Sequence, residues 1–273
     1  LVLVSPAVGI SPLAALASWK RRISLLPGLN GLAWTQVEPE FDPYKYNSFT
    51  ANAAEQVHLL TRSVSNRVQQ RASRGDAKKL PPILVLKSTV DATVSTDAVV
   101  DRLLMLLAPE RHELVLFDIN RFAPTRSLLR EDPGAFTERL LRDRKLPFSV
   151  TLVGNRDSKS RQVAAQYKPP FTRGVTRSET LQAEWPGPVL SLSHIALPFP
   201  PDDPLYGSAP PAEQGTLFLG QQAIQGERGI LKISPNYFLR LRHNPFYGYL
   251  ERRALQWIED AADSTANIQS VPE

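Results

Sequence analysis

The feature that most constrains this chain is a short apolar run that ends in polar residues and an aspartate. The proline pair at 81–82 is followed by four aliphatic residues, Ile83 to Leu86, then by polar residues and Asp91. Such a run is typical of a strand buried on both faces of a parallel sheet. Sites in open α/β sheets form outside the carboxyl ends of strands. Asp91 is therefore a candidate functional carboxylate, and the alternative is that it caps the next helix, a role that Ser95 can also fill.

Apolar runs and helical periodicities alternate along the chain. This alternation predicts an α/β protein with a mostly parallel sheet flanked by helices. Residues 155–188 are polar and show no clear period. The expected strands lie at 1–4, 83–86, 113–117, 148–153 and 189–193, and the expected helices at 12–25, 53–68, 96–108, from 132 onward and 247–262.

Two of the expected helices carry apolar residues at three- and four-residue steps. In the helix expected at 53–68, these residues are Ala53, Val57, Leu60, Val64 and Val68, and in the helix expected at 247–262 they are Leu250, Ala254, Leu255 and Ile258, on one face. Such a stripe is typical of the buried face of an amphipathic helix. We therefore expect these residues to face a core.

Composition excludes several kinds of chemistry. Hydrophobic residues make up 42% of the 273 residues and charged residues 22%, which is an ordinary balance for a soluble globular protein. The chain has no cysteine, so it has no disulfide, thiolate metal site or cysteine nucleophile, and its compartment stays open. No motif for a metal is present, and the segment 226–229 is too short for a phosphate-binding loop. We therefore expect no cofactor.

The net charge of +5 is spread over short basic clusters, such as Lys20–Arg22 and those within 139–145. Solvated helix faces explain such clusters better than a nucleic-acid surface, because no long basic run or aromatic-basic alternation occurs. We expect no nucleic acid as a partner, and binding to an anionic surface is a weaker alternative. Pro6 and Pro12 interrupt the apolar amino-terminal stretch, so no integral membrane segment is expected.

Among the histidines His58, His112, His194 and His243, one has a distinctive setting. His194 ends the expected strand 189–193 and enters the proline-rich stretch 195–207. A stiff loop after a strand can hold an imidazole in a cleft, although an isolated histidine more often has a structural role.

Three segments carry a resemblance to a known family: Val85–Val94, His112–Arg121 and Ser193–Gly207. Together with Leu1–Pro6 and Glu40–Phe49, they resemble bacterial α/β-hydrolases of the serine aminopeptidase/lysophospholipase-like type. The resemblance implies a partial α/β-hydrolase fold whose core comprises residues 1–10 and 81–273, with an insertion at 121–188. Residues 11–80 would then form a helical lid.

The resemblance also implies roles in a catalytic triad. Asp91 would orient His194, and His194 would be the general base and then the general acid. The order of aspartate before histidine agrees with that of α/β-hydrolases. Asp118, which also follows an expected strand, and Asp202 and Asp203, which follow His194, are alternative acids.

The family's nucleophilic serine has no counterpart in the sequence. The Gly-x-Ser-x-Gly motif is absent, and Ser5 is followed by Pro6, which lacks the backbone N–H that an oxyanion hole needs. We therefore expect the chain to be the carboxyl-terminal part of a serine hydrolase of ester or acyl substrates, inactive by itself. An amidase or peptidase, and a non-catalytic binding or scaffold domain, are the alternatives.

Overall fold

The computed structural model describes most of the chain, in two compact units. One unit comprises residues 1–6, 80–92 and 108–273, and the other 7–79 and 93–107. His194 and the helix expected at 12–25 lie outside the described residues. These residues are 1–9, 28–40, 42–44, 46–91, 94–109, 111–122, 132–187, 189–192, 195–212, 218–220 and 242–269.

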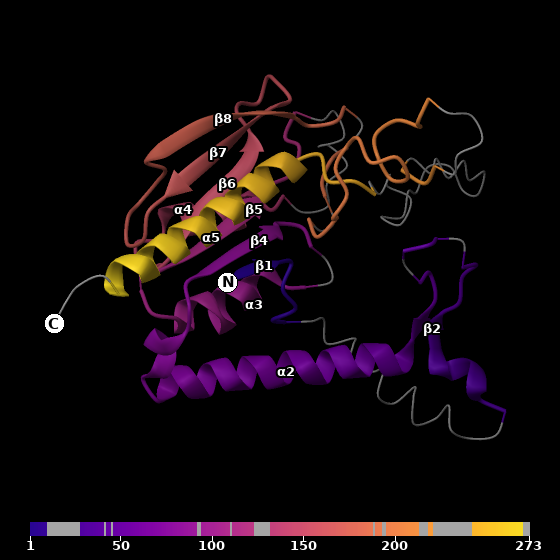
Figure 1. Cartoon of the computed structure of the whole chain (residues 1–273), viewed down its shortest axis with the longest axis horizontal. Coiled ribbons are helices and arrows are strands. Elements are labelled where there is room, and N and C mark those ends of the chain that lie inside the picture. The colour runs from indigo at the N-terminus through magenta and orange to yellow at the C-terminus, as the bar shows by residue number, and fades with distance from the viewer. Residues whose placement is uncertain are drawn as a thin grey trace. The chain divides into compact units, whose positions relative to one another are not determined.

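The first unit is built on a mixed sheet (Figure 1). In the described part of the chain the strand order is β1-β4-β5-β6-β7-β8. The first four strands pair in parallel, whereas β7 and β8 are added in antiparallel orientation. The predicted α/β class with a mostly parallel sheet is therefore confirmed. The strands are β1 (Val2–Val4), β4 (Ile83–Ser88), β5 (His112–Phe117), β6 (Ser149–Asn155), β7 (Gln162–Lys168) and β8 (Arg177–Glu184).

The central strands β4 and β5 are buried along their whole length. Their alternate residues, such as Leu84, Leu86, Val115 and Phe117, belong to one apolar core that continues into β6, β7 and β8. This burial explains why the aliphatic runs were visible in the sequence. A strand covered on both faces loses the polar positions that a half-exposed strand keeps.

The polar segment 155–188 contains two strands that the sequence did not predict. Strand β8 buries only Leu181, while the other seven residues are exposed or partly exposed. An edge strand of this kind is held by its backbone pairing with β7, and its side chains carry little periodic signal.

In the described part of this unit the helices are α4 (Gly134–Arg142) and α5 (Tyr247–Gln269). Figure 1 shows α5, in yellow, lying across the sheet, and Leu250 and Trp257 pack against the core. The predicted apolar face of α5 is covered only in part, because Leu250 packs against the core whereas Leu255 and Ile258 are 54% and 56% exposed. The helix instead turns its larger aromatic residues inward, which removes more apolar area from water.

The second unit is largely helical. Its main helix is α2 (Ala51–Ser73), capped by the Thr50 side chain, which accepts a hydrogen bond from the Ala53 N–H. The other elements that the structure describes in this unit are the 3-10 turns η2 (Asn30–Ala33), η3 (Asp76–Lys79) and η4 (Leu104–Leu106), the strands β2 (Trp34–Gln36) and β3 (Phe49–Thr50), and the helix α3 (Thr96–Arg102).

The predicted helix over 53–68 is confirmed, but its predicted buried face is not. Val57, Leu60 and Val64 are 43%, 64% and 41% exposed, whereas Ala51 and Thr61 are buried. Periodicity correctly identified the helix but not the face that is covered. Whether residues 11–80 act as a lid stays a prediction.

Candidate active site

The carboxyl ends of β4 and β5 are bound to a segment that lies far away in the sequence. Ser88, the last residue of β4, donates a 2.6 Å hydrogen bond from its Oγ to the carbonyl of Leu192. Just beyond β5, the backbone N–H of Asn120 donates to the carbonyl of Leu190 at 2.6 Å, and its side-chain amide donates to Val189 at 3.0 Å. Segment 189–192 is therefore fixed to the end of the sheet where α/β proteins place their sites.

His194 comes two residues after this fixed segment and is itself outside the described residues. Its described neighbour Ile195 is fully buried in the apolar core, and the Ile195 carbonyl accepts a 3.3 Å hydrogen bond from the Asn244 side chain. The strand expected over 189–193 is not formed in its described part. The carbonyls of residues 189–192 accept hydrogen bonds from Ser88 and Asn120, and these residues are not paired with a described strand.

Asp91 lies in the loop after β4, as expected, and forms an ion pair that was not predicted from the sequence. Its Oδ2 atom accepts a 2.9 Å hydrogen bond from Lys87 Nζ, and the exposed fractions of the two side chains are 3% and 0%. Burial lowers the pKa of Lys87, and the hydrogen bond and charge of Asp91 act in the opposite direction. A carboxylate can accept about four hydrogen bonds, so the bond from Lys87 does not by itself exclude one from an imidazole.

Ser95, and not Asp91, is the N-cap of the helix α3. The Ser95 side chain accepts a 3.1 Å hydrogen bond from the Ala98 N–H and is the N-cap of α3. The cap that the helix requires is thus provided without Asp91.

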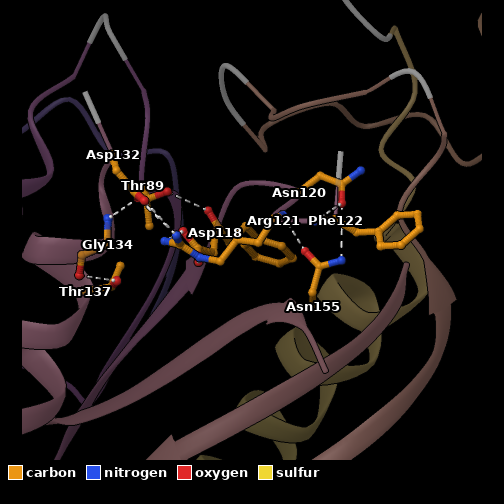
Figure 2. A network of polar contacts seen from close by, with 10 residues as sticks. Thr89, Asp118, Asn120, Arg121, Phe122, Asp132, Gly134, Thr137 and Asn155 are labelled. Atoms are coloured by element: carbon orange, nitrogen blue, oxygen red, sulfur yellow. Dashed lines mark hydrogen bonds and ion pairs between the residues drawn. The ribbon is translucent and has the colours of Figure 1, made fainter. Parts of the chain in front are cut away.

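The alternative acid Asp118 is held by an arginine clamp (Figure 2). Arg121 binds both oxygens of Asp118, from Nε at 2.7 Å and from Nη2 at 3.2 Å, and donates from Nη1 to Asp132 at 3.0 Å. Although burial acts in the opposite direction, the two carboxylates raise the pKa of Arg121. Asp118 is 4% exposed and its two oxygens are engaged by one guanidinium, which makes it a poorer candidate for orienting a histidine.

Two asparagines complete the network in Figure 2. Asn155, at the end of β6, accepts a 2.7 Å hydrogen bond from the Arg121 N–H and donates to Asn120 Oδ1 at 3.2 Å. Asn120 in turn accepts from the Phe122 N–H at 3.2 Å. Neither asparagine was predicted from the sequence as a site residue. The signal that could have found them is their position, because each lies at or just after the end of a predicted strand.

The other alternative acids shape the loop after His194. Asp203 Oδ1 accepts hydrogen bonds from the N–H groups of Leu205 and Tyr206 at 2.9 and 2.7 Å, which fixes a turn. Asp202 is exposed.

Two other histidines are described in buried, structural settings. His112 Nδ1 accepts a 3.0 Å hydrogen bond from the Ile83 N–H, and burial lowers the pKa of His112 to about 4. His243 Nδ1 lies 3.3 Å from the Tyr206 carbonyl, and burial lowers its pKa as well. Since His112 begins β5, it lies at the opposite end of the sheet from Asp91.

Ser5 follows β1 with an unusual backbone conformation. Its φ of 47° is in the left-handed region, and its N–H donates to the Leu86 carbonyl at 2.9 Å. The buried hydroxyl makes no hydrogen bond with any described residue, so it has no base beside it there.

Comparisons with family models, curated proteins and solved structures found no match to this chain. Within the described ranges, no group of three or more His, Asp or Glu side chains is arranged to hold a metal ion. No described helix combines the length and apolarity that crossing a membrane would need.

Proposed function

We propose that this chain carries the acid and the base of a serine hydrolase that acts on carboxylic esters, with Asp91 orienting His194. The observation that carries the proposal is the 2.6 Å hydrogen bond from Ser88 to the Leu192 carbonyl. Asp91 follows Ser88 by three residues and His194 follows Leu192 by two. The span is at most about 3.6 Å per residue, so the chain allows the two side chains to meet.

The proposed chemistry divides the work between two residues. His194 takes the proton of a serine hydroxyl as that oxygen attacks the ester carbonyl, and later returns it to the leaving alcohol. Asp91 fixes the tautomer of the imidazole and stabilises its protonated form. Because the chain contains no Gly-x-Ser-x-Gly motif, the proposal takes the serine from outside this sequence.

The test uses the polypeptide with its natural flanking sequence and a fluorophosphonate probe, which labels activated serines. His194→Ala and Asp91→Asn are each expected to reduce the labelling rate at least 100-fold. His58→Ala, a change in α2, is the matched control and is expected to label normally. Unchanged labelling of His194→Ala overturns the base assignment. A loss in Asp118→Asn with none in Asp91→Asn transfers the acid role to Asp118.

A non-catalytic α/β-hydrolase-like binding domain is the second candidate. It is favoured by the buried pair between Lys87 and Asp91, which gives Asp91 a structural role without any chemistry. Absence of labelling in the unsubstituted polypeptide selects this candidate. If labelling occurs, comparing p-nitrophenyl esters with the matching anilides separates an esterase from an amidase or peptidase.

A further inference from the structure

The face of α5 that is directed toward the sheet is unexpectedly polar in its central part. Tyr249, Arg253, Gln256 and Asp260 recur at steps of three and four residues, and together with Arg252 they line one cavity. A helix packed on a sheet ordinarily buries an apolar stripe at this spacing. The cavity has a volume of about 490 Å³, and its other walls come from β5, β6, β7, β8 and the residue before β8.

The floor of the cavity is a buried and satisfied polar cluster. Glu113 is 4% exposed and accepts a 2.8 Å hydrogen bond from the Thr151 hydroxyl. Its other oxygen is paired with Arg253 of α5. This cluster fixes the helix above the strands. The charges of Glu113 and Arg253 cancel, so the other groups that line the cavity determine what it can bind.

Several side chains above this floor have no polar partner among the described residues. They make no hydrogen bond or ion pair there, although each has the capacity for at least one. Two are guanidiniums placed over tyrosine rings, Arg177 at 5.3 Å from the ring centre of Tyr167 and Arg252 at 5.9 Å from that of Tyr249. The others are the carboxylate of Glu179, the amide of Gln256 and the hydroxyls of Tyr167 and Tyr249.

Tyr249 is central to this group. Burial, with smaller contributions from Glu113 and Glu179, raises its pKa, and the arginines at 253 and 252 act against them. At neutral pH its hydroxyl is therefore a proton-bearing donor as well as an acceptor.

We propose that this cavity binds a small zwitterionic carboxylate of amino-acid size. Guanidinium groups bind carboxylates through paired hydrogen bonds, and a free carboxylate pairs with an ammonium group. Two unpaired arginines and one unpaired glutamate match a ligand with two carboxylates and one ammonium, which is the charge pattern of L-glutamate. The volume falls within the roughly 300 to 1,000 Å³ that is usual for small-molecule sites.

This site is separate from the candidate active site. Glu113 is the second residue of β5, whereas Asp118 follows its last residue. Five residues of strand span roughly 16 Å. The inference therefore does not depend on the proposed hydrolase activity.

Isothermal titration of the protein, with its natural flanking sequence, against L-glutamate tests the inference. We expect saturable binding, with weaker binding of succinate, which lacks the ammonium group, and none of L-lysine. Arg177→Gln and Arg252→Gln are each expected to weaken L-glutamate binding by about tenfold or more. Glu179→Gln is expected to remove the preference for L-glutamate over succinate.

Arg142→Gln is the matched control, because Arg142 pairs with Glu138 on α4 and does not line the cavity. It is expected to bind L-glutamate as the unsubstituted protein does. All three arginines lie on exposed surface, and unchanged circular dichroism spectra would show that the variants fold. The inference is overturned if L-glutamate shows no saturable binding at 10 mM, or if both cavity variants bind it normally. Equal binding of inorganic phosphate also overturns it, because any anion would then suffice.

Discussion

We predict opposite effects on the free energy of unfolding when the same substitution is made at two buried lysines. Lys87 and Lys168 are both fully buried. Lys87 is paired with Asp91 at 2.9 Å, whereas the hydrogen bond of Lys168 Nζ goes to the carbonyl of Pro169 at 3.4 Å, with no carboxylate within 4 Å among the described residues. Methionine has a similar volume and no charge, so each change isolates the effect of the ammonium group.

Lys87→Met is expected to lower the free energy of unfolding by about 3–5 kcal/mol, because it leaves the Asp91 carboxylate buried without its cation. Lys168→Met is expected to be neutral or stabilising by about 1–2 kcal/mol, because it removes a buried charge that forms no ion pair with a described carboxylate. Urea denaturation followed by circular dichroism measures both changes, and an unchanged m-value shows that the comparison is valid. Adding Asp91→Asn to Lys87→Met is expected to recover part of the loss.

The pH dependence provides a second check on Lys168. Burial lowers its pKa in the folded state, with Asp143 acting against this. The unfolded chain therefore binds more protons between the lowered pKa and 10.5, and this group makes the protein more stable as pH rises through that window. Lys168→Met is expected to remove this rise. Equal destabilisation by the two methionine variants would contradict the reasoning, since it would mean that the carboxylate partner makes no difference.

Three further variants test other buried groups. Arg121→Gln leaves Asp118 buried without its clamp and is expected to cost about 3 kcal/mol of unfolding free energy in the same urea assay. The folded state binds the proton of His112 more weakly than the unfolded chain does, so the protein loses about 3 kcal/mol of unfolding free energy as pH falls from 6.5 to about 4. His112→Asn is expected to remove this loss. Acid titration at a fixed urea concentration measures it. Gly207→Ala places a Cβ 2.3 Å from a backbone oxygen and is expected to lower the melting temperature by several degrees, whereas Gly248→Ala, which meets no atom within 4 Å, is expected to be neutral or to raise it.

The parts of the fold that were predictable from the sequence are those in which local residues determine burial. The run Ile83 to Leu86 predicted a strand because its own side chains fill both faces of the sheet. The strands β7 and β8 were not predictable in this way. They are held by backbone pairing with a neighbour, and a chain that reads as polar loop in isolation becomes an edge strand only when that neighbour is present.

The face of a helix that is covered was also not predictable from local residues. On α5 the apolar residues Leu255 and Ile258 are exposed, while the sheet-facing side carries Trp257 and, beside it, the polar lining of a cavity. Hydrophobic periodicity ranks residues by apolarity, but it contains no information on the surface that the helix will meet. On α5, polar residues line a cavity over the sheet, so apolarity alone does not identify the covered residues.

The candidate site was predictable only in its positions along the chain. The end of an apolar run identified Asp91, but Lys87, directly after that run, gave no sign of being buried, because a lysine in a strand is usually directed toward solvent. The ion pair explains why a carboxylate follows β4, and it does so without catalysis. It does not explain why Ser88 and Asn120 bind the carbonyls of segment 189–192. The ion pair between Lys87 and Asp91 does not require these hydrogen bonds. That attachment is what a histidine site needs from its scaffold, and it is the reason for preferring the hydrolase proposal to a purely structural role for Asp91.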